Sequence, residues 1–503
     1  MNDLLRKILT AKVYDVATES PLQVAPRLSA RLGHQVLLKR EDLQPVFSFK
    51  LRGAFNKLAN LTPEALARGV IAASAGNHAQ GVALAARHLG ARATIVMPTT
   101  TPSIKVDAVR ALGATVELHG DSFDHARVYA LTLVEASAAV FVHPFDDLDV
   151  IAGQGTIAME LVRQHPGPID AVFVPVGGGG LLAGIAAYLS YVRPETKVIG
   201  VEPEDAACFR AAMQAGQPVT LSSVGLFVDG CAVARAGDLP FAIAGSLVHE
   251  IITANTDEIC AAIKDVFDDT RSIAEPAGAL AVAGMKRWVD AHPEAKDQVL
   301  IAIDSGANMN FDRLRHVSER AEIGEAREAI FAVAIPERPG AFRTFCETLG
   351  PRSVTEFNYR FADTTKAHVF VGVALRHGRP EREQIVAALR AAAYEVHDLT
   401  DNEVAKLHVR HMVGGKAPAA TDEVVCRFEF PERPGALLNF LTRLSGHWNI
   451  SAFHYRNHGA AYGRVLCGMQ VASNDRAAFF QALTDLGYPF TDETSNTAYR
   501  IFL

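Results

Sequence analysis

The sequence predicts an α/β fold followed by a duplicated α+β fold, and two observations carry this prediction. Over roughly the first 320 residues, apolar strand-like runs alternate with helix-like segments, a pattern typical of parallel or mixed sheets with helices on both faces. In the last third, IPERPGAF (335–342) returns as FPERPGAL (430–437), and FNYR (357–360) returns as FHYR (453–456). Two motifs repeated in the same order indicate an internal duplication. A chain of 503 residues is long enough for several such domains.

The segment SFKLRGA (48–54) places one lysine at the start of a predicted helix, residues 51–58. Phe49 precedes Lys50, and the small residues Gly53 and Ala54 follow it. Partial desolvation by such neighbours lowers a lysine pKa and favours the neutral amine that Schiff-base chemistry needs. Taken alone, a lysine in this context is more often a solvated surface residue, and three further segments argue against that interpretation.

The first of these segments is SAGNHAQG (74–81), between a strand-like run at 69–73 and a helical pattern at 82–89. A strand, a turn and a helix in this order place side chains at the carboxyl end of a strand, where α/β folds bind ligands. Asn77 can both donate and accept hydrogen bonds there, and Ser74 with the exposed amides could bind a carboxylate. The alternative is that Ser74 or Asn77 only caps the helix.

The second segment joins a buried strand, residues 170–176, to a helix through four consecutive glycines, Gly177, Gly178, Gly179 and Gly180. Such a turn leaves backbone N–H groups free to converge on an anion. It is neither a dinucleotide fingerprint nor a P-loop. The uncharged run 171–192 has the length of a membrane span, but Pro175 and the glycines argue against that interpretation.

The third segment is the strand-like run 299–304, which ends in a Ser305-Gly306 turn. Ser305 would supply a neutral hydrogen-bonding group at the end of the strand. Ser-Gly turns are common between secondary-structure elements, so Ser305 is a candidate site residue only when it is considered together with the other segments.

Together, these segments resemble the pyridoxal-phosphate (PLP) enzymes of the tryptophan-synthase β fold type, fold type II, and among them the threonine dehydratases. The resemblance covers nearly the whole chain, and SFKLRGA and SAGNH are specific to the branch of dehydratases and serine racemases. It implies a catalytic domain at residues 1–320 with two subdomains, the smaller at about residues 50–145.

The resemblance also implies roles for individual residues. Lys50 would hold the PLP aldehyde as a Schiff base and act as the catalytic general base. The other PLP contacts implied are Phe49, Asn77 at the phenolic oxygen, Ser305 at the pyridine nitrogen, and Gly177, Gly178, Gly179, Gly180 and Leu181 around the phosphate. The substrate contacts implied are Ser74, Ala75, Gly76 and His78. Glu202 and Glu275 also match segments of the family, without a defined role.

The implied reaction is the elimination and deamination of L-threonine to 2-oxobutanoate and ammonia, the first step of isoleucine biosynthesis, with L-serine as a secondary substrate. Serine racemases of this branch carry a second serine directly before Gly-Asn-His, where this chain has Ala75. Racemisation needs a proton donor on each face of the substrate, so we expect it to be minor at best.

Each copy of the repeat predicts the order β-α-β-β-α-β, a ferredoxin-like plan. We expect Pro339 and Pro434 in the first turn of their helices, where a missing N–H costs nothing. A charged helical stretch at 313–327 would mark the end of the catalytic domain, and residues 414–420 (GGKAPAA) read as a linker. The predicted regulatory domains are therefore residues 327–412 and 421–503.

This pair resembles the tandem ACT-like regulatory domains of biosynthetic threonine dehydratases, which implies feedback inhibition by isoleucine, with valine as a possible antagonist. Phe357 and Tyr359 share one strand face by the two-residue period, as do Phe453 and Tyr455. These four aromatics could line an effector pocket. The alternative is that they pack under a helix.

Composition indicates an enzyme of the cytoplasm. The formal net charge is −7 without a basic cluster, which gives no sign of nucleic-acid binding. Residues 1–8 lack the features of a signal peptide, and the six cysteines are dispersed, as expected for reduced thiols. His408 and His411 have helical spacing, but two ligands without a third do not make a metal site. The resemblance implies a homotetramer, and from the sequence we expect contact with neither nucleic acid nor membrane.

Two other functions remain open from the sequence. One is a different fold-type II PLP lyase or a β-replacement enzyme, whose lysine segment usually differs from SFKLRGA. The other is an amino-acid sensor that keeps a relic catalytic domain. An intact Lys50, glycine turn and Asn77 argue against the sensor.

Overall fold

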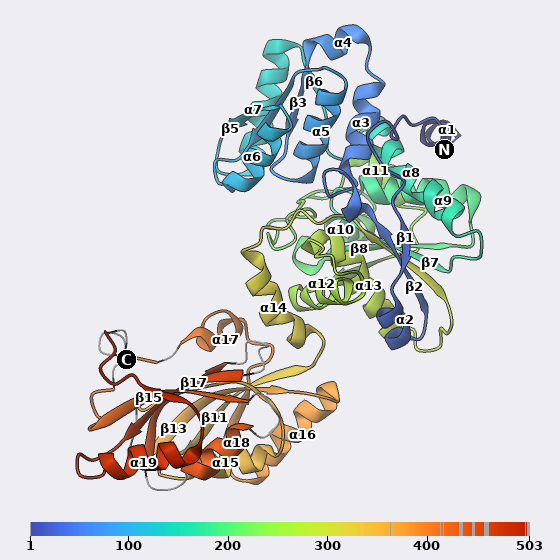
Figure 1. Ribbon diagram of the computed structural model, residues 1–503. Helices are drawn as coiled ribbons and strands as arrows, with labels where there is room; N and C mark the ends of the chain where they lie inside the picture. Colours follow the sequence, from blue (N-terminus) through green and yellow to red (C-terminus); the bar gives the residue numbers. More distant parts are fainter. Residues whose placement is uncertain are drawn as a thin grey trace. The chain divides into compact units, whose positions relative to one another are not determined.

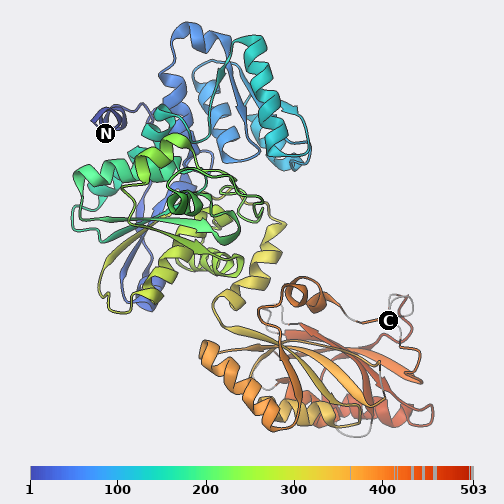
Figure 2. The ribbon, with the colours of Figure 1, turned by 180° about the vertical axis from the view of Figure 1, so that it is seen from behind.

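The computed structural model describes residues 2–362, 364–412, 414–415, 417–431, 436–444, 448–456, 462–497 and 499. The chain divides into two compact units, Met1–Ala321 and Glu322–Leu503 (Figures 1 and 2). The first unit is α/β with two mainly parallel sheets, and the second is α+β with one antiparallel sheet. The predicted fold class is confirmed.

The larger sheet of the first unit has six strands in the order β1-β2-β10-β7-β8-β9. β1 runs antiparallel to β2, and the other neighbours are parallel. The strands are β1 (Leu22–Val24), β2 (Gln35–Arg40), β7 (Ala171–Pro175), β8 (Lys197–Pro203), β9 (Glu250–Ala254) and β10 (Val299–Asp304). Parallel neighbours bring the carboxyl ends of β7, β8 and β10 to one edge of the sheet, where the turns at Gly177 and Ser305 follow.

Helices cover both faces of this sheet because its central strands are apolar on both sides. In β7, Val172 and Val174 pack in a core with α1, α8 and α9, whereas Phe173 packs in a second core with α2, α12 and α13. The helices of this layer are α1 (Asn2–Leu9), α2 (Pro26–Leu32), η1 (Glu41–Leu43), α8 (Leu148–Gln164), α9 (Gly180–Val192), η2 (Glu204–Ala206), α10 (Cys208–Ala215), α11 (Asp238–Ala244), α12 (Thr256–Thr270), α13 (Pro276–Ala291) and α14 (Arg313–Gly324).

The smaller sheet has four parallel strands in the order β5-β4-β3-β6, flanked by helices (Figure 1). Its strands are β3 (Val70–Ala73), β4 (Ala93–Met97), β5 (Thr115–Leu118) and β6 (Val140–Phe141). Its helices are α3 (Lys50–Ala59), α4 (Pro63–Arg68), α5 (Asn77–His88), α6 (Ser103–Ala111) and α7 (Phe123–Ser137). The chain enters this layer at α3 and leaves it through β6 into α8, so α3 and α8 join the two layers.

The second unit contains one eight-stranded antiparallel sheet in the order β14-β11-β13-β12-β16-β17-β15-β18. Each repeat forms half of it, in the predicted order β-α-β-β-α-β. The first half is β11 (Glu328–Pro336), α15 (Ala341–Leu349), β12 (Val354–Arg360), β13 (Lys366–Ala374), α16 (Gly378–Ala391) and β14 (Glu395–Asp398). The second half is β15 (Glu423–Pro431), α18 (Ala436–Leu444), β16 (Asn449–Arg456), β17 (Tyr462–Gln470), α19 (Arg476–Leu486) and β18 (Phe490–Asp492).

The aromatic strands β12 and β16 join the two halves by pairing with each other, with Phe357 opposite Tyr455 and Tyr359 opposite Phe453. The four long helices α15, α16, α18 and α19 lie on one face of the sheet, and α17 (Glu403–Leu407) lies on the other (Figures 1 and 2). The short helix η3 (Val409–His411) follows α17. The duplication predicted from sequence therefore produces one continuous sheet.

The start of α15 differs from the prediction. The helix begins at Ala341, and Gly340 precedes it as the N-cap with φ of 83°, a left-handed conformation that favours glycine. Pro339 thus lies before the helix and not in its first turn, so that prediction is wrong. Pro434, the matching residue of the second copy, lies outside the described residues.

All six cysteines are free and buried. No helix in the described ranges combines the length and the apolar character that crossing a membrane requires.

Candidate active site

Lys50 is the first residue of α3, and its side chain is partly buried between neighbouring segments. Its Nζ donates a hydrogen bond of 3.0 Å to the carbonyl oxygen of Pro144. The same Nζ lies 5.3 Å from the ring centroid of the buried Phe49. Burial lowers the pKa of Lys50 to about 8, because an ammonium loses hydration there. About a tenth of this amine is therefore neutral at pH 7, and the neutral amine is the form that a nucleophile or general base requires.

The turn after β3 brings an amide side chain into the same region. Ser74 Oγ accepts from the backbone N–H of Gly76 at 3.2 Å. Asn77, the first residue of α5, donates through Nδ2 to Glu275 Oε1 at 2.5 Å. Its Oδ1 accepts from Asn308 Nδ2 at 2.7 Å. Both ends of the Asn77 amide are therefore held in a fixed orientation.

The neighbours of Asn77 leave room on one side of this turn. A Cβ atom added at Gly76 would meet no atom within 4 Å, and Ala75 is partly exposed. His78 is buried, and its Nε2 lies 2.9 Å from the carbonyl oxygen of Val142. Burial lowers the pKa of His78 to about 3, so this imidazole stays neutral. The space beside Gly76 is the part of the turn that a ligand can approach.

The four glycines form the junction between β7 and α9. Gly179 has φ of 92° and is the N-cap of α9, without a side-chain hydrogen bond to the helix. Within the described part of the chain, the backbone amides of Gly177, Gly178, Gly180 and Leu181 have no hydrogen-bond partner. Free amides at a helix N-terminus are suited to an anion such as a phosphate.

Packing is a second reason for glycine in this junction. A Cβ at Gly178 would lie 2.4 Å from the ring of Phe145, and one at Gly180 would lie 2.9 Å from the Phe145 Cβ. A Cβ at Gly179 would lie 2.7 Å from the ring of Phe209. The glycines therefore allow close packing on one side while their amides remain free.

Ser305 follows β10 and is tied to the lysine segment through the backbone. Its carbonyl oxygen accepts from the N–H of Phe49 at 3.2 Å, and Ser48 forms an isolated bridge with Gly306. Ser305 Oγ is buried and donates to the carbonyl oxygen of Ala277 at 3.1 Å. The turn after β10 thus brings a neutral hydroxyl close to the start of α3.

The two glutamates that the sequence singled out occupy different environments. Glu275, the N-cap residue of α13, faces Asn77, and burial together with nearby Asp229 raises its pKa to about 7. Glu202 instead accepts from the backbone N–H groups of Phe209 and Arg210, at 2.7 and 2.8 Å. Burial raises the pKa of Glu202 to about 7 as well. Glu275 belongs to the candidate site, and Glu202 caps α10.

Sequence reasoning missed the segment between β6 and α8. It supplies the Pro144 carbonyl for Lys50 and the Phe145 ring for the glycine turn. His143 Nδ1 accepts from Asp146 N–H at 2.8 Å and holds this turn, and burial lowers the pKa of His143 to about 4. The sequence HPFDD (143–147) has neither a hydrophobic period nor a motif spacing that would indicate a site. Asn308 was also missed, although it lies three residues after Ser305.

The aromatics proposed for an effector pocket, Phe357, Tyr359, Phe453 and Tyr455, are buried in the core of the second unit. The rings of Phe357 and Phe453 contact each other with 5.3 Å between centroids, and the Tyr359 hydroxyl donates to Glu337. Their role in effector binding stays a prediction.

A hollow lies beside this core. It is lined by residues of both repeats: Arg338, Pro339, Gly340, Phe342 and Arg343 from the first, and Leu441, Trp448, Asn449, Ile450 and Met469 from the second.

Among the described residues, no group of three or more His, Cys, Asp or Glu side chains could hold a metal ion. His408 and His411 lie at the end of α17 and in η3.

Comparison with known families divides the chain in two. Residues 13–306 match the family described as pyridoxal-phosphate-dependent enzymes. Residues 319–409 and 415–503 match the C-terminal regulatory domain of threonine dehydratase.

The chain is similar over its full length to biosynthetic L-threonine dehydratases. It is 57% identical to that of Burkholderia multivorans, with 100% of this chain and 99% of the relative covered. It is 54% identical to that of Escherichia coli, covering 100% and 97%. It is 50% identical to the mitochondrial threonine dehydratase of Saccharomyces cerevisiae, covering 100% and 89%.

Solved structures match about two thirds of the chain. The processed form of threonine deaminase isoform 2 from Solanum lycopersicum gives a TM-score of 0.63 at 51% identity, covering 64% of this chain and 88% of that one. Maize serine racemase gives 0.59 at 29% identity, covering 63% and 96%.

Proposed function

We propose that this chain, which belongs to the biosynthetic threonine dehydratases, converts L-threonine into 2-oxobutanoate and ammonia at Lys50. The threonine dehydratases are PLP-dependent lyases. The observation that carries the proposal is the partly buried amine of Lys50, which binds the Pro144 carbonyl oxygen and has its pKa lowered to about 8. It lies close to the turns after β3 and β10 and to the segment packed on the glycine turn.

The residues around Lys50 fit PLP. A neutral lysine amine would attach to the cofactor aldehyde, and the free amides of Gly177, Gly178, Gly180 and Leu181 would hold its phosphate. We assign the Ser305 hydroxyl to the pyridine nitrogen, the Asn77 amide to the phenolic oxygen and Phe49 to the cofactor's surroundings. When bound, PLP supplies an electron sink for negative charge at the substrate α-carbon.

Lys50 would then act as the general base at the substrate α-carbon. Proton transfer needs a base whose pKa lies near the working pH, and burial has brought the pKa of Lys50 into this range. Because His78 and His143 stay neutral, neither adds a positive charge that would depress the Lys50 pKa further.

The turn at residues 74–78 would bind the substrate carboxylate. Ser74, Ala75, Gly76 and His78 line the amino-terminal end of α5, where the helix dipole favours an anion. The open space beside Gly76 supports this assignment. Glu275, with its pKa raised to about 7, is partly protonated near neutrality and adds less negative charge at this end than an ordinary carboxylate would.

L-serine would react at the same residues, because it differs from threonine by one methyl group on the carbon that bears the hydroxyl. Loss of that methyl removes apolar contact worth about 1–3 kcal/mol at most. We therefore propose L-serine as a secondary substrate.

The second unit would bind isoleucine as a feedback inhibitor, with valine as an antagonist. Phe342, Leu441 and Ile450 give the hollow between the repeats an apolar wall suited to a branched aliphatic side chain, and Arg338 could pair with a carboxylate. Phe357, Tyr359, Phe453 and Tyr455 would support this hollow from the core. We also propose a homotetramer acting in the cytoplasm, which sedimentation equilibrium and cell fractionation would test.

Product analysis tests the reaction. With L-threonine alone and PLP present, we expect 2-oxobutanoate and ammonia in equal amounts. A product that appears only with a second nucleophile would instead indicate a β-replacement enzyme. Binding of amino acids without turnover would indicate a sensor.

A further inference from the structure

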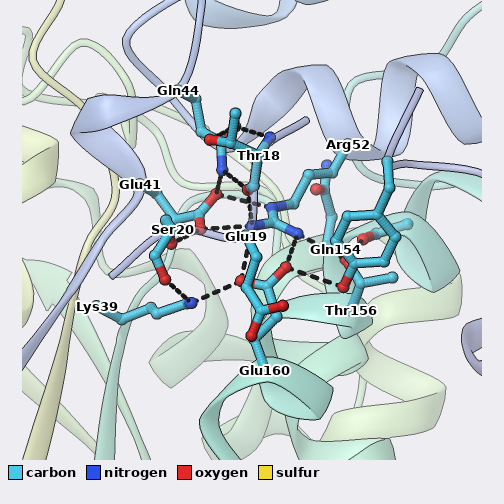
Figure 3. Close-up of polar contacts among 12 residues, drawn as sticks. Thr18, Glu19, Ser20, Lys39, Glu41, Gln44, Arg52, Gln154, Thr156 and Glu160 are labelled. Atoms are coloured by element: carbon cyan, nitrogen blue, oxygen red, sulfur yellow. Dashed lines mark hydrogen bonds and ion pairs between the residues drawn. The ribbon is translucent and has the colours of Figure 1, made fainter. Parts of the chain in front are cut away.

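A buried network of charged side chains contacts α3 two residues after Lys50 (Figure 3). We call the side chains of Lys39, Glu41, Arg52 and Glu160 the Arg52 network. All four are fully buried, and they come from β2, η1, α3 and α8. Two cations face two anions, so the network is formally neutral.

Arg52 is held by both carboxylates at once. Its Nε and Nη2 donate to the two oxygens of Glu41, each at 2.8 Å. Its Nη1 and Nη2 donate to the two oxygens of Glu160 at 2.6 and 3.0 Å. Thr156 Oγ1 accepts a further bond of 3.1 Å. A planar guanidinium bound in this way at two edges has a fixed orientation.

Lys39 completes the charge balance from the other side of Glu160. Its Nζ donates to Glu160 Oε2 and to the Ser20 carbonyl oxygen, both at 2.6 Å, and to Gln164 Oε1 at 3.0 Å. Glu160 therefore receives hydrogen bonds from two cations and holds α8 against both β2 and α3.

Helix geometry connects this network to the amine of Lys50. Residues two apart on an α-helix differ by about 200° around its axis, so Lys50 and Arg52 leave α3 on nearly opposite sides. The backbone between them is also tightly enclosed. A Cβ at Gly81 of α5 would lie 3.0 Å from Leu51 N, and one at Gly153 of α8 would lie 2.6 Å from the Arg52 carbonyl oxygen. Because Lys50 and Arg52 belong to the same turn of α3, a small rotation of that turn would move the Lys50 amine.

Burying an ion pair seldom stabilises a fold more than apolar packing does, but it can specify one geometry. We propose that Arg52 is a positioning residue for the reaction, because its two-sided binding to Glu41 and Glu160 fixes the first turn of α3 and thereby the place of the Lys50 amine. This inference rests on the role of Lys50 in the proposed function.

Two variants separate positioning from folding. Arg52→Lys keeps the positive charge and loses the planar guanidinium that binds both carboxylates. Arg52→Met combined with Glu41→Gln removes one charge of each sign, which leaves Lys39 paired with Glu160 and the network neutral. Arg31→Lys is the matched control, since Arg31 binds Asp265 at 2.6 Å in the same unit, away from α3.

Three quantities are measured on the holoenzyme: kcat and KM for L-threonine, the urea midpoint, and the pH midpoint of the visible band of bound PLP. We expect Arg52→Lys to lower kcat about 10- to 100-fold, as a displacement near 1 Å does, with a much smaller change in KM. The visible band should titrate at a shifted pH. The double variant should have a urea midpoint close to that of the unmodified enzyme, but its kcat should stay low. Arg31→Lys should match the unmodified enzyme in all three quantities.

The proposal is overturned if the double variant recovers kcat together with stability, or if Arg52→Lys retains both kcat and the spectral midpoint. If the double variant does not fold, Arg52→Lys decides. Failure of both to fold would assign the network to folding alone and would also overturn the proposal. Activity that persists in Lys50→Ala would instead refute the proposed function, whatever the Arg52 variants do.

Discussion

At the scale of single residues, the candidate site depends on burial more than on charge pairing. Lys50 hydrogen bonds to a carbonyl oxygen and has no carboxylate within an ion-pair distance in the described chain, so burial dominates and its pKa falls to about 8. Glu275 shows the reverse effect, since burial raises its pKa to about 7. Both groups therefore titrate close to neutral pH.

Glu275→Gln should change how stability depends on pH. The folded state holds a proton on Glu275 up to pH 7, whereas the unfolded carboxyl loses it near 4.5. This contribution is present below pH 4.5 and is lost as the pH rises to 7, on the order of 3 kcal/mol. The variant should therefore lose less stability over this range.

Urea titrations at pH 5 and 7, followed by tryptophan fluorescence from Trp288 in the first unit and Trp448 in the second, would measure this change. Glu202 also has its pKa raised to about 7, so part of the dependence should remain. Exposed Glu195→Gln is the control. An unchanged dependence in Glu275→Gln would contradict the assigned protonation.

Ala75→Ser should raise racemisation. The substitution adds a hydroxyl in the partly exposed turn at residues 74–78, where we propose that the substrate binds, and this hydroxyl would be the second proton donor that racemisation needs. Chiral chromatography of serine after prolonged incubation would measure D-serine. Ala75→Gly is the control, because it changes the same position without adding a hydroxyl. An unchanged D-serine yield would refute the assignment of this turn to the substrate.

The sequence indicated the location of those candidate residues that follow the end of a strand. Asn77, Ser305 and the glycines come directly after β3, β10 and β7, so a strand–turn–helix pattern is enough to find them. Pro144 acts through its backbone carbonyl and Phe145 through ring packing. Neither type of contact leaves a signature in one sequence, because every residue has a carbonyl oxygen and aromatic rings pack at many places in a fold.

At the scale of secondary-structure elements, close helix contacts determine the geometry near Lys50. α8 crosses α3 where Gly153 meets Arg52 and Gly53. α5 approaches the same turn at Gly81. The small residues at these crossings allow the backbones of α5 and α8 to approach that of α3. The Arg52 network fixes the position of α8 along α3.

Gly153→Ala should push α8 away from α3. The added Cβ would lie 2.6 Å from the Arg52 carbonyl oxygen and 2.7 Å from Gly53 Cα, and backbone atoms cannot move aside as a flexible side chain can. We expect a loss of about 1–3 kcal/mol in stability and a lower kcat. Thermal unfolding and initial rates would measure both.

Gly415→Ala is the matched control, because a Cβ there meets no atom within 4 Å. Equal stability of the two variants would show that the crossing tolerates the extra atom.

The elements themselves were largely predictable, and their exact starts were not. The predicted helix at 51–58 corresponds to α3, and the strand-like runs before Gly177 and Ser305 correspond to β7 and β10. α15 starts at Ala341 because Gly340 adopts a left-handed conformation before it. Such a conformation depends on the backbone path, which a Pro-Gly dipeptide alone does not determine.

At the scale of the whole molecule, the duplication has a structural consequence that the repeat did not predict. The two halves of the second unit share one sheet through β12 and β16. Sequence repeats indicate similar domains, but the pairing of two edge strands depends on their shape and exposure after folding. Residues of both repeats line the hollow described above.

Asn449→Ala should weaken inhibition by isoleucine. Asn449 Nδ2 donates to Glu337 Oε1 at 3.0 Å and to Gln470 Oε1 at 3.1 Å, and so links the two repeats at the hollow. Loss of these bonds should raise the half-inhibitory isoleucine concentration about tenfold, with little change in the uninhibited rate.

Thr442→Ala, on the exposed side of α18, is the control. An unchanged isoleucine response in Asn449→Ala would exclude the hollow as the effector site.

The central claim is that the Lys50 amine carries the reaction, and one measurement tests it most directly. Initial rates of 2-oxobutanoate release from L-threonine are compared for the unmodified enzyme, Lys50→Ala and the exposed control Lys12→Ala, all with PLP. We predict that Lys50→Ala loses about 10²- to 10⁴-fold in rate, while Lys12→Ala does not. A Lys50→Ala rate close to that of the unmodified enzyme would contradict the account.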